Sequence, residues 1–264
     1  MGRLPRIFGW CYDVILMVML EEQAQTAPVG TGSEKERAVQ RMFSSIARYY
    51  DLNNSLLSLG LHHSWKRQAA AHLREDSRVV LDVGAGTADL ALLAARRLGE
   101  HARVVAVDLN GPMMAIGLQK VRTARLQRQI LCVQANAERL CVPDSVFDAV
   151  TTGFCMRNVA DLPQALQEIR RVLKPGGRLI CLEFSRPVAG WLRRLYDWYS
   201  FTLLPWIGTR VSGDTTGVYQ YLPASIRSFP DQNGLARLLR EVGFQKVEYH
   251  NLSGGIVAVH VAVK

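Results

Sequence analysis

Two glycines and one aspartate have types and spacing that could bind a nucleoside. An apolar run, 79–83, leads into Gly84 and Gly86, and a second run, 104–107, ends in Asp108, 24 positions beyond Gly84. In open α/β sheets the first turn faces the ligand, and an acid after the second strand accepts hydrogen bonds from ribose hydroxyls. A glycine turn also occurs as an ordinary turn that binds no ligand, and an aspartate at the end of a strand can instead cap the following helix. The combination favours a nucleoside site.

The elements that must position these residues alternate along the chain. Strands are predicted at 79–83, 104–108, 130–134, 147–152 and 178–184, and helices at 90–98, 112–128 and 161–173. This alternation indicates right-handed crossovers and a parallel sheet. Two last runs, 247–252 and 256–263, flank Ser-Gly-Gly, which is typical of a hairpin. A parallel sheet that ends in a hairpin argues against a dehydrogenase and its nicotinamide cofactor.

The N-terminal part of the chain differs in composition from the rest. Residues 1–37 are interpreted as an extension and linker, which leaves 38–264 as one domain. The apolar stretch 10–20 is shorter than the roughly 20 residues that span a bilayer. It is either an interfacial anchor or an extension outside the fold, and we prefer the second. Helical patterns at 38–46 and 65–73 predict either a lid over the ligand edge or packing helices.

An aromatic-rich insertion is predicted at 187–230, between the fifth strand and the last helix. It holds nine of the 21 aromatic residues of the chain, with arginines interleaved. Trp and Tyr are favoured where one side is apolar and the other is wet. The insertion therefore predicts a pocket or surface for a large apolar ligand at a membrane. An aromatic core of a subdomain is the alternative, and the two are compatible.

Charge and cysteine content limit the partners. The 264 residues carry 32 Lys and Arg against 23 Asp and Glu, a net charge of +9, which favours anionic partners. The chain has no run of five basic residues and no zinc-finger spacing, so we expect no nucleic-acid partner. Its five cysteines share no CxxC spacing, which indicates reduced core thiols of a cytosolic protein and no metal site.

Several further segments together resemble one family. They are 50–54, 58–62, 65–66, 136–138, 157–159, 173–178, 182–185, 221–226 and 252–258. In these segments the chain resembles the ubiquinone/menaquinone biosynthesis C-methyltransferases, a family of class I S-adenosylmethionine-dependent methyltransferases. The resemblance extends from about Met42 to Lys264. It implies a Rossmann-like, seven-stranded, mostly parallel sheet that ends in an antiparallel hairpin.

The resemblance implies methyl transfer from S-adenosyl-L-methionine to a ring carbon of a prenylated quinol. Demethylmenaquinol is the expected substrate, and the methoxy-benzoquinol of ubiquinone biosynthesis, or both, is the alternative. A methyltransferase for a soluble metabolite and a non-catalytic membrane-associated protein are more remote alternatives. We expect a cytoplasmic protein associated with the inner face of the membrane, and a homo-oligomer remains open.

The same resemblance assigns residues to the cofactor. Its contacts fall on Gly84, Gly86, Thr87, Asp108, Asn136, Ala137 and Gly153. The chain departs from the family at two places: Ala88 stands where many members have glycine, and Cys155-Met156 stands where glycine and an aliphatic residue are usual. The second departure, Cys155-Met156, affects the expected shape of the floor of the pocket and leaves the expected chemistry unchanged.

Carbon methylation of a quinol requires stabilisation of a phenolate next to the reacting carbon. Our hypothesis is that Arg157 supplies the positive charge and that Asn158 orients it. The alternative is that Arg157 pairs with a structural carboxylate. His62 and His250 are weaker candidates for a base, and each is more typical of a packed or surface histidine.

Overall fold

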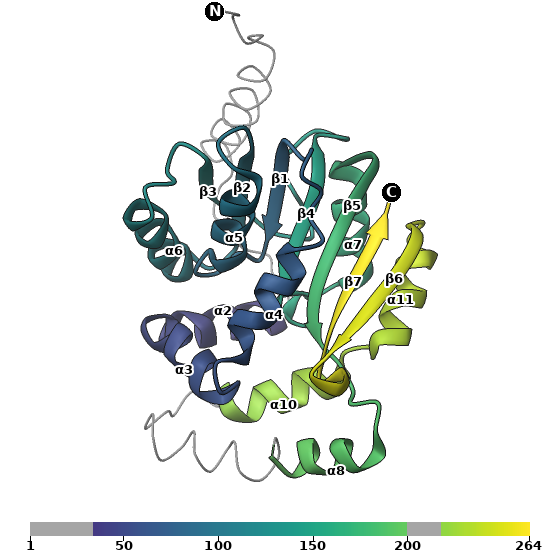
Figure 1. The fold of residues 1–264 in the computed structure, drawn as a ribbon. Helices are drawn as coiled ribbons and strands as arrows, with labels where there is room; N and C mark the ends of the chain where they lie inside the picture. The colour runs from purple at the N-terminus through teal and green to yellow at the C-terminus, as the bar shows by residue number, and fades with distance from the viewer. Residues whose placement is uncertain (1–33, 200–217) are drawn as a thin grey trace, which may run out of the picture.

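The structure is a computed structural model that describes residues 34–199 and 218–264 (Figure 1). The anchor or extension predicted at the N-terminus lies outside the described residues, except for its last four. The middle of the aromatic insertion, with Phe201 and Trp206, lies outside them as well.

A seven-stranded sheet with the order β3-β2-β1-β4-β5-β7-β6 forms the centre of the molecule. The strands are β1 (Val79–Val83), β2 (Arg103–Asp108), β3 (Ile130–Gln134), β4 (Phe147–Gly153), β5 (Leu173–Phe184), β6 (Gln245–Leu252) and β7 (Val257–Val263). The first five are parallel, and β7 runs antiparallel to both β5 and β6. The predicted sheet with its closing hairpin is therefore confirmed.

Helices cover both faces of the sheet because alternate strand residues are buried on opposite sides. One face packs α4 (Leu61–Ala70) and α5 (Asp89–Leu98) on the side chains of Val80, Val104 and their neighbours. The other face packs α7 (Leu162–Val172) and α11 (Gln232–Glu241). Asp161 and Asp231 cap these two helices, because each carboxylate accepts a hydrogen bond from a backbone N–H of the first turn.

Several element boundaries differ from the prediction, and three of them illustrate the reasons. α6 (Gly111–Thr123) ends five residues early, since Arg125 adopts a left-handed conformation and the N–H of Leu126 turns back to the carbonyl of Val121. β5 begins at Leu173 rather than 178 because Leu173 pairs with Phe147 of β4. α2 (Glu34–Ile46) begins four residues before the predicted start at 38.

Four helices lie at the end of the sheet to which the parallel strands point (Figure 1). They are α2, α3 (Tyr50–Leu57), α8 (Gly190–Trp198) and α10 (Val218–Ser228), and the last two belong to the insertion. This arrangement sets two sequence-distant segments around the carboxyl edge of the strands, where ligands bind in open α/β sheets. Within the two described ranges, no helix is both long and apolar enough to cross a bilayer.

Candidate functional site

A small cleft of about 110 Å³ lies at the carboxyl ends of β1, β2 and β4. Six of the seven residues predicted to contact the cofactor line it: Gly84, Gly86, Asp108, Asn136, Ala137 and Gly153. They come from four separate segments of the chain. The parallel strands bring these segments together because their carboxyl ends share one edge of the sheet.

Asp108 is the acidic group of the cleft. Its Oδ2 accepts a hydrogen bond from the Gly86 N–H at 2.8 Å, and its Oδ1 accepts one from the Asn110 N–H at 2.7 Å. Burial raises the pKa of this carboxyl, and the backbone N–H groups act in the opposite direction. The carboxylate keeps lone-pair capacity beyond these bonds, so it can also accept a hydrogen bond from a ribose hydroxyl.

Helix α2 closes one side of the cleft through Asn110. The Asn110 Nδ2 donates to the Gln40 carbonyl at 3.0 Å and to the Ser44 Oγ at 2.9 Å, while its Oδ1 caps α6 by accepting from the Met113 N–H. One asparagine thus holds α2 to the loop that follows β2. The helix predicted before the first strand accordingly lines the ligand edge.

The residues of the cleft fit a nucleoside methyl donor. A Cβ added to Gly86, whose φ is +53°, would lie 3.3 Å from the Cε of Met113 and 4.0 Å from the Oδ2 of Asp108. A side chain there would fill the space in front of the acid. Val107, Leu109 and Ala137 offer apolar surface beside it, as the adenine of S-adenosylmethionine requires.

The other small residues of the turn serve the packing of the protein itself. A Cβ on Gly84 would lie 2.1 Å from the Sγ of Cys155, so this glycine makes room for the cysteine that departs from the family pattern. Ala88 is fully buried at the N-terminus of α5 with a φ of +63°, a left-handed conformation that glycine adopts at lower cost.

Thr87 is placed differently from the prediction. Its buried hydroxyl donates to Oδ1 of Asp51 on α3 at 2.8 Å, and its side chain is not among those that line the cleft. Lys120 of α6 donates to Asp51 at 2.9 Å and also to Asp89, which Lys66 of α4 contacts at 2.7 Å. Thr87 therefore belongs to a polar network that holds α3 against the turn.

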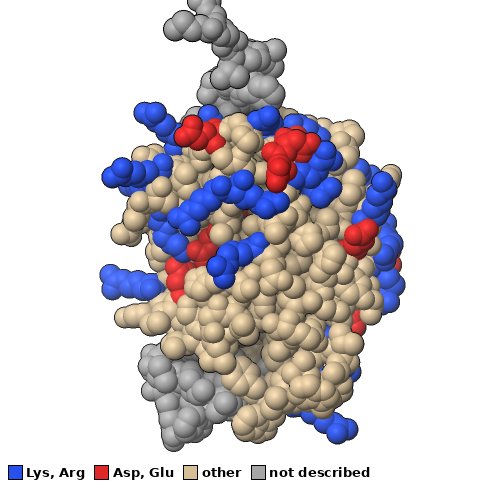
Figure 2. Space-filling model, in the orientation of Figure 1, with Lys and Arg blue, Asp and Glu red and all other residues tan. Residues whose placement is uncertain are grey.

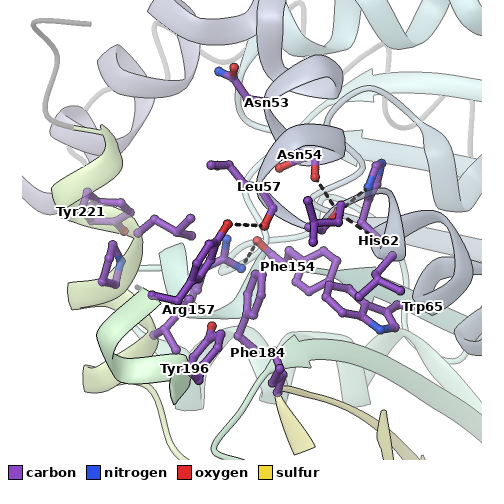
Figure 3. A pocket seen from close by; sticks show the side chains of 18 of the residues that line it. Asn53, Asn54, Leu57, His62, Trp65, Phe154, Arg157, Phe184, Tyr196 and Tyr221 are labelled. Carbon is purple, nitrogen blue, oxygen red and sulfur yellow. Dashed lines mark hydrogen bonds between the residues drawn. The ribbon is translucent and has the colours of Figure 1, made fainter. Parts of the chain in front are cut away.

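A larger cavity of about 400 Å³ adjoins the cleft on the side of the insertion. Figure 3 shows Tyr221 of α10 on one side of this cavity and Trp65 and His62 of α4 on the other, with Phe154 and Arg157 between them. The lining is mostly apolar and comes from α2, α3, α4, α8 and α10. A cavity of this size and character suits a bulky apolar molecule.

Three aromatic residues form a wall that belongs to both spaces. Phe43, Tyr50 and Phe154 line the cleft and the larger cavity alike. Phe154 has a φ of +57°, which is uncommon for an aromatic residue, and its N–H donates to the Leu182 carbonyl at 2.8 Å. Strained backbone of this kind concentrates at functional sites.

Arg157 lies beneath the larger cavity and is buried. Its Nη1 donates to the Oε1 of Glu183 at 2.7 Å and to the carbonyl of Phe154 at 2.6 Å, and the guanidinium lies 5.2 Å from the ring centroid of Phe184. The pairing with a buried carboxylate, the alternative reading of this residue, is thus present. Arg157 also lines the cavity, and its buried Nε has no partner among the described residues.

Asn158 stands beside Arg157 and is held in two directions. Its Nδ2 donates to the same Phe154 carbonyl at 3.1 Å, and its Oδ1 accepts from the hydroxyl of Tyr221 at 3.1 Å. Burial raises the pKa of Tyr221, which favours the protonated, donating form. Asn158 therefore links Tyr221 of the insertion to the Phe154 carbonyl, which also accepts a hydrogen bond from Arg157.

The two histidines considered as bases differ in position. His62 lines the larger cavity, its Nδ1 lies 2.9 Å from the Oγ of Ser58, and burial lowers its pKa to about 4. It is therefore uncharged at neutral pH. His250 is an exposed residue of β6 that stacks on His72 and does not line either space.

Sequence reasoning missed the shared wall, Asn110 and Glu183. Tyr50 was visible only as part of a family segment, and Phe43 only as one position on a helix face. The left-handed Phe154 had no signal in the residue types. Glu183 lies 26 positions from Arg157, and only the pairing of β4 with β5 brings the two together.

Comparisons with known proteins show which family this chain is similar to. The model of the ubiE/COQ5 methyltransferase family matches residues 31–264. The ubiquinone/menaquinone biosynthesis C-methyltransferase UbiE of Legionella pneumophila (strain Paris) is 45% identical over 251 residues, which cover 93% of this chain and 100% of that protein.

Solved structures share the fold at low sequence identity. A methyltransferase from Thermotoga maritima is 20% identical with a TM-score of 0.59 and covers 86% of this chain and 99% of its own. The [4+2]-cyclase SpnF is 19% identical with a TM-score of 0.65, and the match covers 88% of this chain and 97% of SpnF. The fold alone thus does not fix the reaction. The family match, together with the cleft built on Asp108, places this chain in the ubiE/COQ5 family of S-adenosylmethionine-dependent methyltransferases.

Proposed function

We propose that the protein methylates a ring carbon of a prenylated quinol, with demethylmenaquinol as the substrate and menaquinol as the product. The methoxy-benzoquinol of ubiquinone biosynthesis is the second candidate, since the name of the Legionella relative covers both pathways. The observation that carries the proposal is the apolar cavity of about 400 Å³, which shares a wall with the donor cleft. The proposed place of work is the cytoplasmic side of the membrane that holds the quinol.

S-adenosyl-L-methionine supplies a methyl group on a sulfonium, which is already electrophilic. The contribution of the protein is to place the acceptor carbon in line with that methyl and to exclude water. Asp108 holds the ribose end, and the wall of Phe43, Tyr50 and Phe154 stands where the two ligands meet. A carbon–carbon bond forms, the sulfur–methyl bond breaks, and the ring proton leaves to solvent.

Arg157 is proposed to stabilise the phenolate form of the quinol. Because Glu183 balances its charge, the effect comes from donated hydrogen bonds in a dry site rather than from net charge. Glu183 and the Phe154 carbonyl both engage Nη1, so the remaining donors of the guanidinium are proposed to serve the substrate oxygen in the cavity that Arg157 lines. Asn158 and Tyr221 keep the Phe154 carbonyl and the guanidinium in position.

The proposal is tested with purified enzyme, labelled S-adenosylmethionine and each quinol supplied separately. Mass spectrometry of the products should show a methyl on a ring carbon of the naphthoquinol. Exclusive methylation of the benzoquinol would move the protein to the second pathway, and methylation of neither quinol would refute the proposal. Arg157→Ala should lose turnover by roughly 100-fold or more while calorimetry shows unchanged donor binding. Normal turnover in this variant would remove Arg157 from the mechanism.

A further inference from the structure

Exposed large hydrophobic side chains gather at one place on the molecule. Over the described residues there are nine of them, and all belong to α3 with its flanking turns, to the start of α4, or to α8 and the residue Val188 before it. Scattered exposed hydrophobic residues need no explanation, whereas a contiguous patch marks an interaction site. In Figure 2 the charged side chains gather over the upper half of the view, and the surface below, over α10 and α8, is largely tan.

Eight of the nine side chains form two stripes, and the ninth is Leu61 at the start of α4. The first contains Tyr49, Leu52, Leu56 and Leu59, spaced by three, four and three residues. The second contains Val188, Trp191, Leu195 and Trp198 with the same spacing. Within α3 this spacing places Leu52 and Leu56 on one side of the helix, and within α8 it does the same for Trp191, Leu195 and Trp198. Tyr49, Leu59 and Val188 lie in the residues that flank the two helices. Leu59 and Trp191 are the most exposed, at 85% and 70%.

The two stripes lie next to each other at the larger cavity. The hydroxyl of Tyr199, just after α8, donates to the Leu57 carbonyl at the end of α3 at 3.0 Å. Leu59, Leu195 and Trp198 contribute both to the exposed stripes and to the cavity lining. The stripes therefore border the entrance of the cavity on two sides.

Arginines accompany the α8 stripe. Exposed Arg186, Arg193 and Arg227 line a hollow of about 300 Å³ next to α8, in which Asp197 is the one acidic residue and contacts Arg227 at 3.2 Å. Arg194 adds a further exposed cation on the helix. Tryptophans flanked by arginines are suited to the boundary between lipid tails and headgroups.

We infer that the two stripes form a docking face for an anionic phospholipid bilayer, with the arginines on phosphate headgroups and the cavity entrance opening to the acyl chains. A bilayer fits better than a second copy of the chain, because a protein partner over both stripes would close the entrance to a substrate with a long tail. This choice rests on the proposed prenylated substrate. The stripes and the arginines themselves do not depend on it.

The test uses the full chain and sedimentation with vesicles of phosphatidylcholine alone or with added phosphatidylglycerol. The variant Leu52→Gln/Leu56→Gln/Trp191→Gln changes stripe residues that do not line either cavity. It should bind both kinds of vesicle more than about 100-fold less tightly, since burying each such side chain is worth roughly tenfold. Arg193→Gln/Arg194→Gln should weaken binding only to the anionic vesicles, by about 25-fold. Arg122→Gln/Arg128→Gln, exposed on the α6 side, is the matched control and should bind normally.

Methylation of a short-chain quinol in detergent separates this inference from the proposed function, because the stripe variant should retain it. Vesicle binding by the stripe variant equal to that of the unaltered chain would overturn the inference. It would also be overturned if light scattering showed a stable dimer that the stripe variant dissolves, since a second copy would then cover the face. Loss of vesicle binding only on removal of residues 1–33 would assign docking to that segment instead. Methylation of no quinol would refute the proposed function while leaving the vesicle result intact.

Discussion

Lys120 should couple protein stability to ligand binding, because it joins three helices around the Thr87 turn. It contacts Asp89 of α5 and Asp51 of α3. Burial acts to raise the pKa of Asp89, but Lys66 and Lys120 outweigh it and hold the value at about 2. Against an ordinary value of 3.8, this difference corresponds to roughly 2 kcal/mol, shared between the two lysines.

Lys120→Met should therefore lower the free energy of unfolding by roughly 1 to 2 kcal/mol at neutral pH. About half of the Asp89 contribution is lost, and the more exposed Asp51 pair adds about 0.5 kcal/mol. Because the pKa of Asp89 is depressed in the folded state, its contribution is present above about pH 4 and is lost as pH falls toward 2. The difference between variant and unaltered protein in urea unfolding should shrink over that range.

The functional part of the prediction concerns α3. Without Lys120, Asp51 and Thr87 hold the helix less firmly, so KM for both donor and acceptor should rise several-fold. Lys174→Met is the matched control, since Lys174 contacts Asp148 at 2.5 Å, away from both cavities. It should cost stability and leave KM unchanged. Equal effects of the two substitutions on KM, or none from Lys120→Met, would refute the reasoning.

Three further predictions concern single residues. Asp108→Asn should weaken S-adenosylmethionine binding by about 10- to 100-fold in calorimetry, because hydrogen bonds from the ribose to a charged acceptor are lost; unchanged affinity would place the ribose elsewhere. Tyr221→Phe removes the donor to Asn158 and should lower kcat by about fivefold with donor affinity unchanged, so an effect on donor affinity alone would contradict this role. Burial raises the pKa of Asp82 to about 7, so the folded state keeps this proton longer than the unfolded chain, and the free energy of unfolding should fall as pH rises from 4 to 7. Asp82→Asn should flatten that slope in urea titrations, and an unchanged slope would assign it to other groups.

Six of the seven residues expected at the cofactor line one cleft, and the sequence could place them together because the determinants are local. Small or polar residues end or directly follow β1, β2 and β4, as Gly84, Asp108 and Gly153 do, and parallel strands bring such positions to one edge. The role of Thr87 was harder to predict, since its hydroxyl bonds to Asp51, 36 residues away. The pairing of Arg157 with Glu183 likewise follows from strand register, and periodicity does not encode it.

The positions of the helices around the larger cavity were likewise hard to predict from local sequence patterns. The aromatic content of the insertion indicated an apolar ligand, and α8 and α10 do line that cavity. The partner helix α3 was visible only through the family segment 50–54, in the gap between the helical patterns predicted at 38–46 and 65–73. Its position depends on contacts of Asp51 and Tyr199 with distant residues, which no local pattern contains.

The methyl donor and the quinol acceptor are proposed to meet across the wall of Phe43, Tyr50 and Phe154. A structure of the protein with S-adenosylhomocysteine and the demethylated quinol tests it most directly. We expect the ribose on Asp108, the quinol ring at Phe154 beside Arg157, and the tail between α3 and α8. The ring carbon should then stand in line with the sulfur, close enough for a methyl group to pass between them. A quinol bound outside the larger cavity, or with a hydroxyl oxygen rather than a ring carbon facing the sulfur, would contradict it.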